Sequence, residues 1–296
     1  MLIFSWAVTF FVYSFCFRRL NYKYLLRKLQ LPIFIGNKKL RHSLGRPSRS
    51  DLVQLEFLEL KGKYQMAYTM THILIAEKLY KEFNKKIDYA TYILGSTAPD
   101  AVHVLADYTS RLKEKSHIFP TGARWGEVSK EDDEENWLES ISQYYMANRR
   151  NDSTGFFEGY IIHLLSDVYC AIHFYEPFIK SITGDIGKKK NQFKEESYGV
   201  NYYFYKRYQK EKNLYQLLST GKAETMDGVI DKKTIEERIS QLFEFEFKYR
   251  DISNVDAYEI CTVGEMEKMV EGACEFIIKE IENKRYKNFF NNGENE

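Results

Sequence analysis

Residues 155–180 are apolar on nearly every side of a helix, in the run GFFEGYIIHLLSDVYCAIHFYEPFIK. A helix that lacks a polar face has to be covered by other elements, so this run predicts a buried central helix. Only five prolines occur among the 296 residues, which leaves room for long helices elsewhere. The sequence therefore favours an all-α fold with residues 155–180 at its centre.

Six further segments from residue 71 onward can be read as helices. They are 71–85, 100–115, 133–149, 195–218, 232–250 and 263–286. The last of these begins with Thr262 and Glu265 in the spacing of a capping box. Residues 181–194 are rich in glycine and lysine and predict a long basic loop. We expect a single bundle-like domain of seven or eight helices over residues 66–290.

Residues 1–65 differ from the rest of the chain in charge and pattern. They hold 12 Lys and Arg against 3 Asp and Glu, a net charge of +9, whereas the remainder carries −8. Residues 31–65 show no sustained helical or strand period. We therefore expect residues 1–65 to lie outside the core, and residues 66–296 to fold and bind metal without them.

Three interpretations of this first segment stay open. The apolar run 2–17, followed by basic residues, is typical of a membrane anchor, although it is shorter than the roughly 20 residues of a full span. A cleaved signal peptide is a second interpretation, but no basic residue precedes the run and no small-residue cleavage site follows it. In the third, translation starts at Met66, and the protein is cytoplasmic.

The residues able to bind a metal are concentrated in one window. Five of the six histidines lie between His72 and His173, and none follows. The four cysteines are scattered and form no CxxC pair, which argues against a cysteine-based zinc finger or a dense disulfide framework. A metal site in this chain would therefore use histidine and carboxylate ligands.

His163 and Asp167 are four residues apart in the predicted central helix. Their side chains leave the same helix face, with about 5–6 Å between the Cβ atoms. This arrangement suits two ligands of one metal, or a histidine ligand with its orienting carboxylate. An unpaired Asp167 would be costly to bury among apolar neighbours. The alternative is a buried His–Asp hydrogen bond inside a helix bundle.

Other polar residues in the window have a structural and a functional interpretation each. Asp100 follows Pro99, so it is expected in a first helical turn. There its carboxylate is either a functional group kept ionised by the helix dipole or an ordinary helix cap. His72 and His117 are each either structural histidines or ligands. His103, three residues after Asp100, is either its partner, an additional ligand or a surface residue.

His173 is set apart from the central pair by helix geometry. On a straight helix it lies about 80° around from His163 and about 120° from Asp167. It is therefore expected either to serve a second metal, with Glu176 nearby, or to pack.

Five short segments occur in a fixed order: MTHILIAEKL, YILGSTAPDAVH, KEKSHIF, EGYIIHLLSD and AIHF. Each is weakly specific alone, but in this order they resemble the zinc-dependent phospholipase C family. That family includes bacterial phosphatidylcholine-preferring phospholipases C and the catalytic domain of glycosylphosphatidylinositol-specific phospholipase D, and it is related in architecture to S1/P1-type nucleases. The resemblance covers about residues 66–180 and implies an all-α fold with up to three zinc ions between helices.

The resemblance also implies a role for each matching residue. The ligands of one zinc would be Asp100, His117, His163 and Asp167. Asp167 would bridge to a second zinc held by His72. Asp100 matches the proposed general base of the family, and His173 matches the first ligand of the remaining zinc.

Two departures from the family pattern reduce the expected number of metals. Secreted members use a mature N-terminal Trp as a ligand, and residues 66–71 contain none. The family's further His and Glu ligands after the His173 position have no counterpart, since residues 184–196 contain no histidine. We therefore expect one or two zinc ions rather than three.

The function implied is a zinc-dependent phosphodiester hydrolase of the phospholipase C/D type. Zinc lowers the pKa of bound water to about 7 and acts as a Lewis acid, so a metal-bound hydroxide would attack a phospholipid or related phosphodiester. A nuclease-like or small-molecule phosphodiesterase is one alternative, and a catalytically inactive metal-binding helical protein is another. The expected partner is the phospholipid or other phosphodiester substrate, with a membrane surface as a second partner and no stable nucleic-acid partner.

Overall fold

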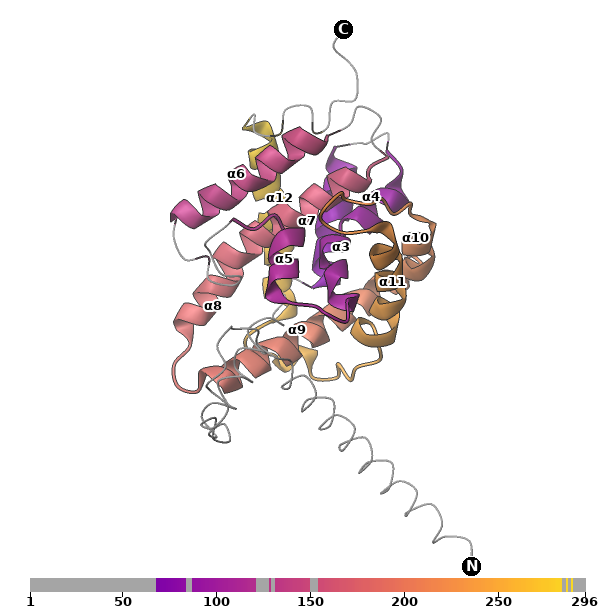
Figure 1. Cartoon of the computed structure of the whole chain (residues 1–296). Coiled ribbons are helices and arrows are strands. Elements are labelled where there is room, and N and C mark those ends of the chain that lie inside the picture. The colour runs from indigo at the N-terminus through magenta and orange to yellow at the C-terminus, as the bar shows by residue number, and fades with distance from the viewer. Residues whose placement is uncertain are drawn as a thin grey trace, which may run out of the picture. The chain divides into compact units, whose positions relative to one another are not determined.

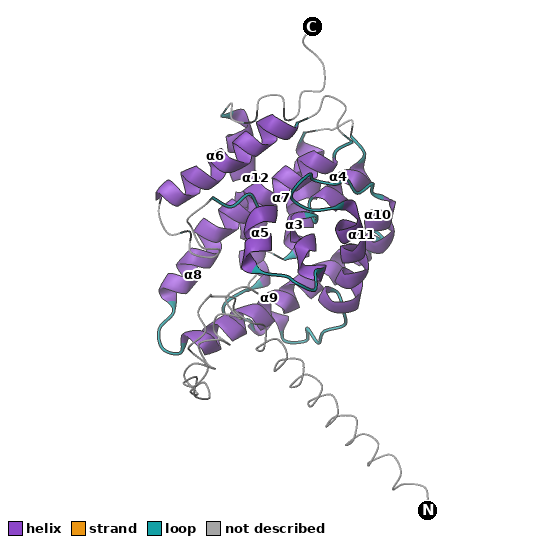
Figure 2. Cartoon of the chain, in the orientation of Figure 1, coloured by secondary structure: helices purple, strands orange, loops and turns teal. Residues whose placement is uncertain are grey.

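The computed structural model describes residues 68–83, 87–120, 128, 131–149, 154–283, 286 and 289. Within these ranges the regular structure is helical, apart from one isolated antiparallel bridge between Met226 and Ile230 (Figure 2). The expected all-α fold class is confirmed. Residues 1–65, with their apolar run 2–17 and the expected boundary at residue 66, lie outside the described residues. No helix in the described ranges is both long enough and apolar enough to cross a membrane.

Ten α-helices form this part of the protein (Figure 1). They are α3 (Thr69–Glu82), α4 (Tyr89–Gly95), α5 (Ser110–Ser116), α6 (Glu131–Asn148), α7 (Phe156–Cys170), α8 (Glu176–Ser181), α9 (Ile186–Gln209), α10 (Leu214–Thr220), α11 (Lys232–Gln241) and α12 (Val263–Glu282). Two 3₁₀ turns, η1 (Pro99–Val104) and η4 (Val255–Ala257), and two π-helical turns, η2 (Ala171–Tyr175) and η3 (Leu242–Glu246), connect or extend them. The number exceeds the expected seven or eight mainly because several expected segments divide, as 155–180 does into α7, η2 and α8.

The buried central helix is α7, as the sequence predicts. Every one of its residues except Tyr169 is buried, and it contacts α3, α4, α6 and α12. Two glycines bring the backbones of α4 and α7 into direct contact. A Cβ on Gly159 would lie 2.0 Å from the carbonyl oxygen of Tyr92, and one on Gly95 would lie 2.1 Å from that of Phe156. This close crossing sets the second half of α4 against the first turn of α7.

The prediction of a long basic loop over residues 181–194 is wrong. Helix α9 begins at Ile186, and the side chain of Asp185 accepts a hydrogen bond from the backbone N–H of Lys188 at 3.1 Å. The lysines of the first turn precede Phe193, which is buried in the core and anchors the helix. The segment is helical because the N-cap and the buried aromatic residue two turns later stabilise a helix more than the local glycines and lysines disfavour it.

Candidate metal centre

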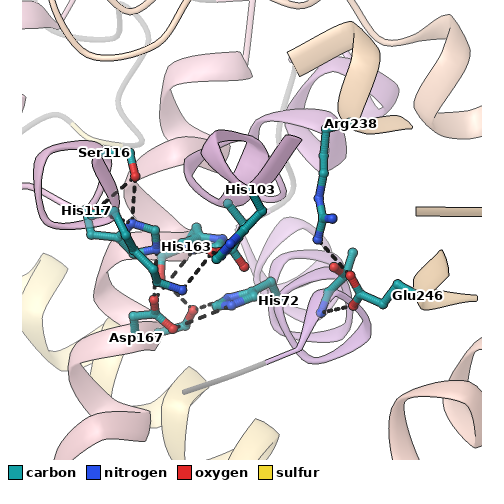
Figure 3. A network of polar contacts seen from close by, with 12 residues as sticks. His72, His103, Ser116, His117, His163, Asp167, Arg238 and Glu246 are labelled. Carbon is teal, nitrogen blue, oxygen red and sulfur yellow. Dashed lines mark hydrogen bonds and ion pairs between the residues drawn. The ribbon is translucent and has the colours of Figure 1, made fainter. Parts of the chain in front are cut away.

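Three elements bring polar side chains together against two side chains of α7 (Figure 3). Helix α3 supplies His72, turn η1 supplies Asp100, and the residue that ends α5 is His117. Helix α7 supplies His163 and Asp167. The side chains of all five are at most 3% exposed, so the cluster is closed to solvent.

The two carboxylate oxygens of Asp167 face different histidines. Its Oδ1 lies 3.5 Å from Nε2 of His72. Its Oδ2 lies 3.1 Å from Nε2 of His117 and 3.7 Å from Nε2 of His163. The carboxylate therefore stands between one histidine on one side and two on the other.

Backbone carbonyls fix the tautomers of His117 and His163. Nδ1 of His163 lies 2.8 Å from the carbonyl oxygen of Ser96, and Nδ1 of His117 lies 2.9 Å from that of Lys113. A carbonyl oxygen only accepts, so each Nδ1 carries the hydrogen and each Nε2 presents a lone pair. These two Nε2 atoms lie 3.2 Å apart. In neutral rings with these tautomers neither atom can donate to the other, and a cation bound to both would remove the repulsion.

The tautomer of His72 follows from Ser166. The Ser166 hydroxyl donates to the carbonyl oxygen of His163 at 2.7 Å, so its oxygen accepts from Nδ1 of His72, also at 2.7 Å. The ring of His72 stacks on that of His163, with 3.7 Å between centroids. Nε2 of His72 and Oδ1 of Asp167 are buried and have no hydrogen-bond partner. Two buried, unpartnered acceptors that face each other form a site for a cation.

Asp100 is held by a buried lysine. Its Oδ1 accepts a hydrogen bond from Nζ of Lys113 at 2.9 Å and lies 3.5 Å from Nε2 of His117. Nε2 of His103, on the same turn, lies 3.4 Å from the same oxygen. Burial acts to raise the pKa of Asp100, but the charge of Lys113 and the contacts with the two histidines hold it well below its usual range. Asp100 is therefore ionised at neutral pH.

Three histidines of the site, His72, His103 and His163, are neutral bases at physiological pH. Burial lowers the pKa of His72 and lowers that of His163 well below its usual value. Burial also lowers the pKa of His103 to about 4. Neutral imidazoles bind metals, and a ring whose other nitrogen donates to a carbonyl or hydroxyl is oriented as metal-binding histidines commonly are.

His117 sits at a strained corner of the backbone. The following residue, Ile118, has a φ of 50°, a left-handed conformation that is rare for a β-branched side chain. Trp137 of α6 donates from Nε1 to the carbonyl oxygen of His117 at 3.0 Å. The indole and the end of α5 thus fix the direction of the His117 ring.

Among the residues that the structure describes, two groups of three side chains could each hold a metal, and within each group the donor atoms lie within 4.8 Å of one another. One is His72, His163 and Asp167, and the other is Asp100, His117 and His163. Nδ1 of His163 is occupied by Ser96, so its Nε2 can serve only one of two metals. Histidine and carboxylate donors without cysteine suit a catalytic zinc, which keeps a position open for water. The residues present therefore fit zinc.

A sequence model described as zinc dependent phospholipase C matches residues 71–248, more than half of the chain. The chain belongs to the zinc-dependent phospholipase C family. The match begins within α3 and extends past the expected motif region, through α9, α10 and α11 to the residues that follow η3. No curated protein and no solved structure matched the chain.

Five of the six metal ligands expected from the sequence lie together in this member of the zinc-dependent phospholipase C family. His173 does not join them. It lies on the π-helical turn η2 with an exposed side chain, and its ring contacts Tyr169 at 4.5 Å between centroids. Its direction around the helix takes it away from the cluster, as helix geometry indicates, and its role as a ligand of a separate metal stays a prediction.

The sequence pattern does not single out Lys113, and it leaves His103 as a partner of Asp100, an additional ligand or a surface residue. Lys113 stands among charged residues in KEKSHIF and resembles a surface lysine, yet it is buried against Asp100. The signal available was its spacing, since Lys113 and His117 are four residues apart and share one face of α5. His103 was an open alternative, and the structure turns its Nε2 toward Asp100.

Proposed function

We propose that this chain hydrolyses phosphodiester bonds of phospholipids with zinc. The observation that carries the proposal is the convergence of three imidazole Nε2 atoms on the carboxylate of Asp167, with the tautomers set by hydrogen bonds at Nδ1. Membership of the zinc-dependent phospholipase C family supports the same function.

The chain would hold one zinc with Asp100, His117, His163 and Oδ2 of Asp167. His72 and Oδ1 of Asp167 would contribute to a second. Zinc, when bound, supplies a Lewis acid for the phosphoryl oxygens and lowers the pKa of water to about 7. We keep the expectation of one or two zinc ions, because the single Nε2 atom of His163 cannot bind a metal in both groups of donor side chains.

The remaining chemistry belongs to the protein's own groups. Asp100 orients the attacking water and accepts its proton, and Lys113 keeps this carboxylate ionised for that role. The water oxygen bonds to phosphorus as the bond to the leaving oxygen breaks, and that oxygen takes up a proton. Ser96 and Ser166 hold His163 and His72 in the orientation that the metals need.

A panel of substrates with metal analysis tests this proposal. The purified chain should contain one or two zinc equivalents and cleave vesicular phosphatidylcholine, and Asp167→Asn should abolish the cleavage. Release of phosphocholine identifies cleavage of the C type, and release of choline identifies the D type. Turnover of bis-p-nitrophenyl phosphate or an oligonucleotide, but not of phospholipid, would instead establish a small-molecule phosphodiesterase or a nuclease-like enzyme.

A metal-binding protein without turnover is a second candidate. The closed cluster and the absence of histidine from residues 184–196 favour it. Zinc bound in stoichiometric amounts, with no product from any substrate of the panel, would establish this alternative.

A further inference from the structure

In the described part of the chain, the metal centre joins two buried carboxylates to a single buried ammonium. The carboxylates of Asp100 and Asp167 and the ammonium of Lys113 are all shielded from solvent. Nζ of Lys113 lies 2.9 Å from Oδ1 of Asp100. The basic neighbours of Asp167 are imidazoles, those of His72, His117 and His163 (Figure 3). The two carboxylates are therefore unequal, because one contacts an ammonium and the other contacts histidine rings.

A pair of facing acceptors lies at Asp167. Oδ1 of Asp167 and Nε2 of His72 are buried without a hydrogen-bond partner, and they lie 3.5 Å apart. The hydrogen of the His72 ring is on Nδ1, which faces the hydroxyl of Ser166, so neither atom of the pair can donate to the other. Two buried acceptors in this position are stabilised by a cation between them. The strongest requirement for a metal is therefore at Asp167.

At Asp100 the protein itself supplies the positive charge. Lys113 donates a hydrogen bond to Oδ1 of Asp100, and Nε2 of His103 lies 3.4 Å from the same oxygen. Nε2 of His103 is also buried without a hydrogen-bond partner. A neutral ring that carries its hydrogen on this nitrogen can face a carboxylate without a metal. Asp100 thus has a cation and a potential N–H donor, whereas the acceptors at Asp167 and His72 have neither.

A metal ion bound by Asp100 would meet the ammonium of Lys113. Oδ1 of Asp100, which accepts the hydrogen bond from Lys113, lies 3.5 Å from Nε2 of His117. An ion shared by Asp100 and His117 would therefore lie beside the lysine, and two positive charges a few ångströms apart repel strongly in a buried site. Such an ion requires the ammonium to withdraw. The flexible stem of lysine allows this movement, while the carbonyl of Lys113 stays bonded to Nδ1 of His117.

We propose that Lys113 is an internal competitor of zinc for Asp100. The first zinc then binds around Asp167, with His72 and His163, while Asp100 remains paired with the lysine. A second zinc, which uses Asp100, binds more weakly because it has to displace the ammonium. The inference rests on the proposed function for the identity of the metal. It deepens that function by giving the order in which the expected ions bind and the residue that sets this order.

The test measures zinc bound to the full chain at equilibrium. The metal-free protein is dialysed against a series of free zinc concentrations set by a chelator, and bound zinc per chain is measured by elemental analysis. The parent should bind its second zinc at least about tenfold more weakly than its first. Lys113→Met should strengthen the second binding step by at least about tenfold and leave the first unchanged. Lys115→Met removes an exposed ammonium of the same helix and should behave as the parent.

A double substitution keeps the test decisive if Lys113→Met alone fails to fold. Asp100→Asn combined with Lys113→Met removes both charges of the buried pair, so neither is left uncompensated. This variant should bind one zinc with the affinity of the parent, because the first site does not use Asp100. His72→Gln, in contrast, should weaken the first binding step by at least about tenfold, since it removes a donor of that site.

Two results would overturn the proposal. One is loss of the first zinc from the double variant, because Asp100 would then belong to the tighter site. The other is a second binding step in Lys113→Met that is no stronger than in the parent and in Lys115→Met. The readout is binding rather than turnover. An active phospholipase that binds both ions equally well would contradict this inference alone, and the expected order of binding in a protein without turnover would contradict only the proposed hydrolysis.

Discussion

Nε2 of His117 and Nε2 of His163 face each other across 3.2 Å, and each ring already donates from Nδ1 to a backbone carbonyl. The carbonyls of Lys113 and Ser96 thus determine the chemistry of both rings before any metal arrives. In neutral rings held this way, both Nε2 atoms present lone pairs, so a cation between them would stabilise the pair.

Chelation should therefore destabilise the protein. A metal that binds only the native state stabilises it by about 4 kcal/mol when its free concentration is 1,000 times its dissociation constant. We expect the melting temperature to fall when zinc is removed and to recover when zinc is returned. Calorimetry with and without chelator measures this. A metal-free protein whose melting is unchanged by added zinc would contradict the assignment of a metal centre.

Asp167 and His173 should behave very differently. Asp167→Asn removes the charge that faces three imidazoles, so activity should fall by more than about 100-fold and zinc occupancy should drop. His173→Ala removes an exposed ring and should leave both near the parent values. Metal analysis and initial rates of both variants provide the comparison. Equal and small effects would mean that Asp167 merely packs.

Gly159 should tolerate no side chain. Gly159→Ala would place a Cβ 2.0 Å from the carbonyl oxygen of Tyr92, and backbone has to move to accommodate it. We expect a loss of about 1–3 kcal/mol or more in the free energy of unfolding. Gly264→Ala is the matched control, since nothing lies within 4 Å of its Cβ and the substitution lies in the first turn of α12. Urea unfolding of the two variants should separate them clearly.

The zinc-free protein should lose stability as the pH falls below about 6.5. Burial lowers the pKa values of His72, His103 and His163 in the folded state, so the unfolded chain binds more protons in this range. Each histidine contributes a slope of about 1.4 kcal/mol per pH unit until its folded pKa is reached. His103→Gln should remove one such contribution between about pH 6.5 and its folded pKa of about 4. An unchanged slope would show that His103 is not buried as a neutral ring.

Lys113 should matter more without zinc than with it. In the zinc-free protein its ammonium compensates the buried charge of Asp100, so Lys113→Met should cost about 3–5 kcal/mol. Bound zinc would take over part of this compensation and reduce the loss. Unfolding free energies of the variant and its parent, each with and without zinc, test this. A loss of the same size in both states would separate Lys113 from the metal site.

The parts of the fold and site that follow from local pattern were predictable. The i, i+4 spacing of His163 and Asp167 on an apolar helix is realised, and Thr262 and Glu265 form the expected capping box. Ordered fragments that resemble a known family located His72, Asp100 and His117, which no local rule would have joined.

The errors arise where tertiary contacts decide. Residues 181–194 look like a loop until the burial of Phe193 is known, because the stabilising contact lies two turns from the cap. Lys113 looks like a surface lysine because it stands among charged residues, and its partner Asp100 is 13 residues away in the sequence. The π-helical turn η2, on which His173 lies, does not follow from the regular pattern of 155–180 either.

The closure of the cluster has a kinetic consequence. With every donor side chain at most 3% exposed, a chelator cannot approach a bound ion directly, and a phosphodiester substrate reaches it only when the bundle opens locally. Exchange must wait for a local opening of the bundle, and the opening rate is a property of the protein alone. Zinc should therefore leave in a first-order process with a rate that does not rise with chelator concentration, and the protein should retain its metal for far longer than an open surface site of the same affinity.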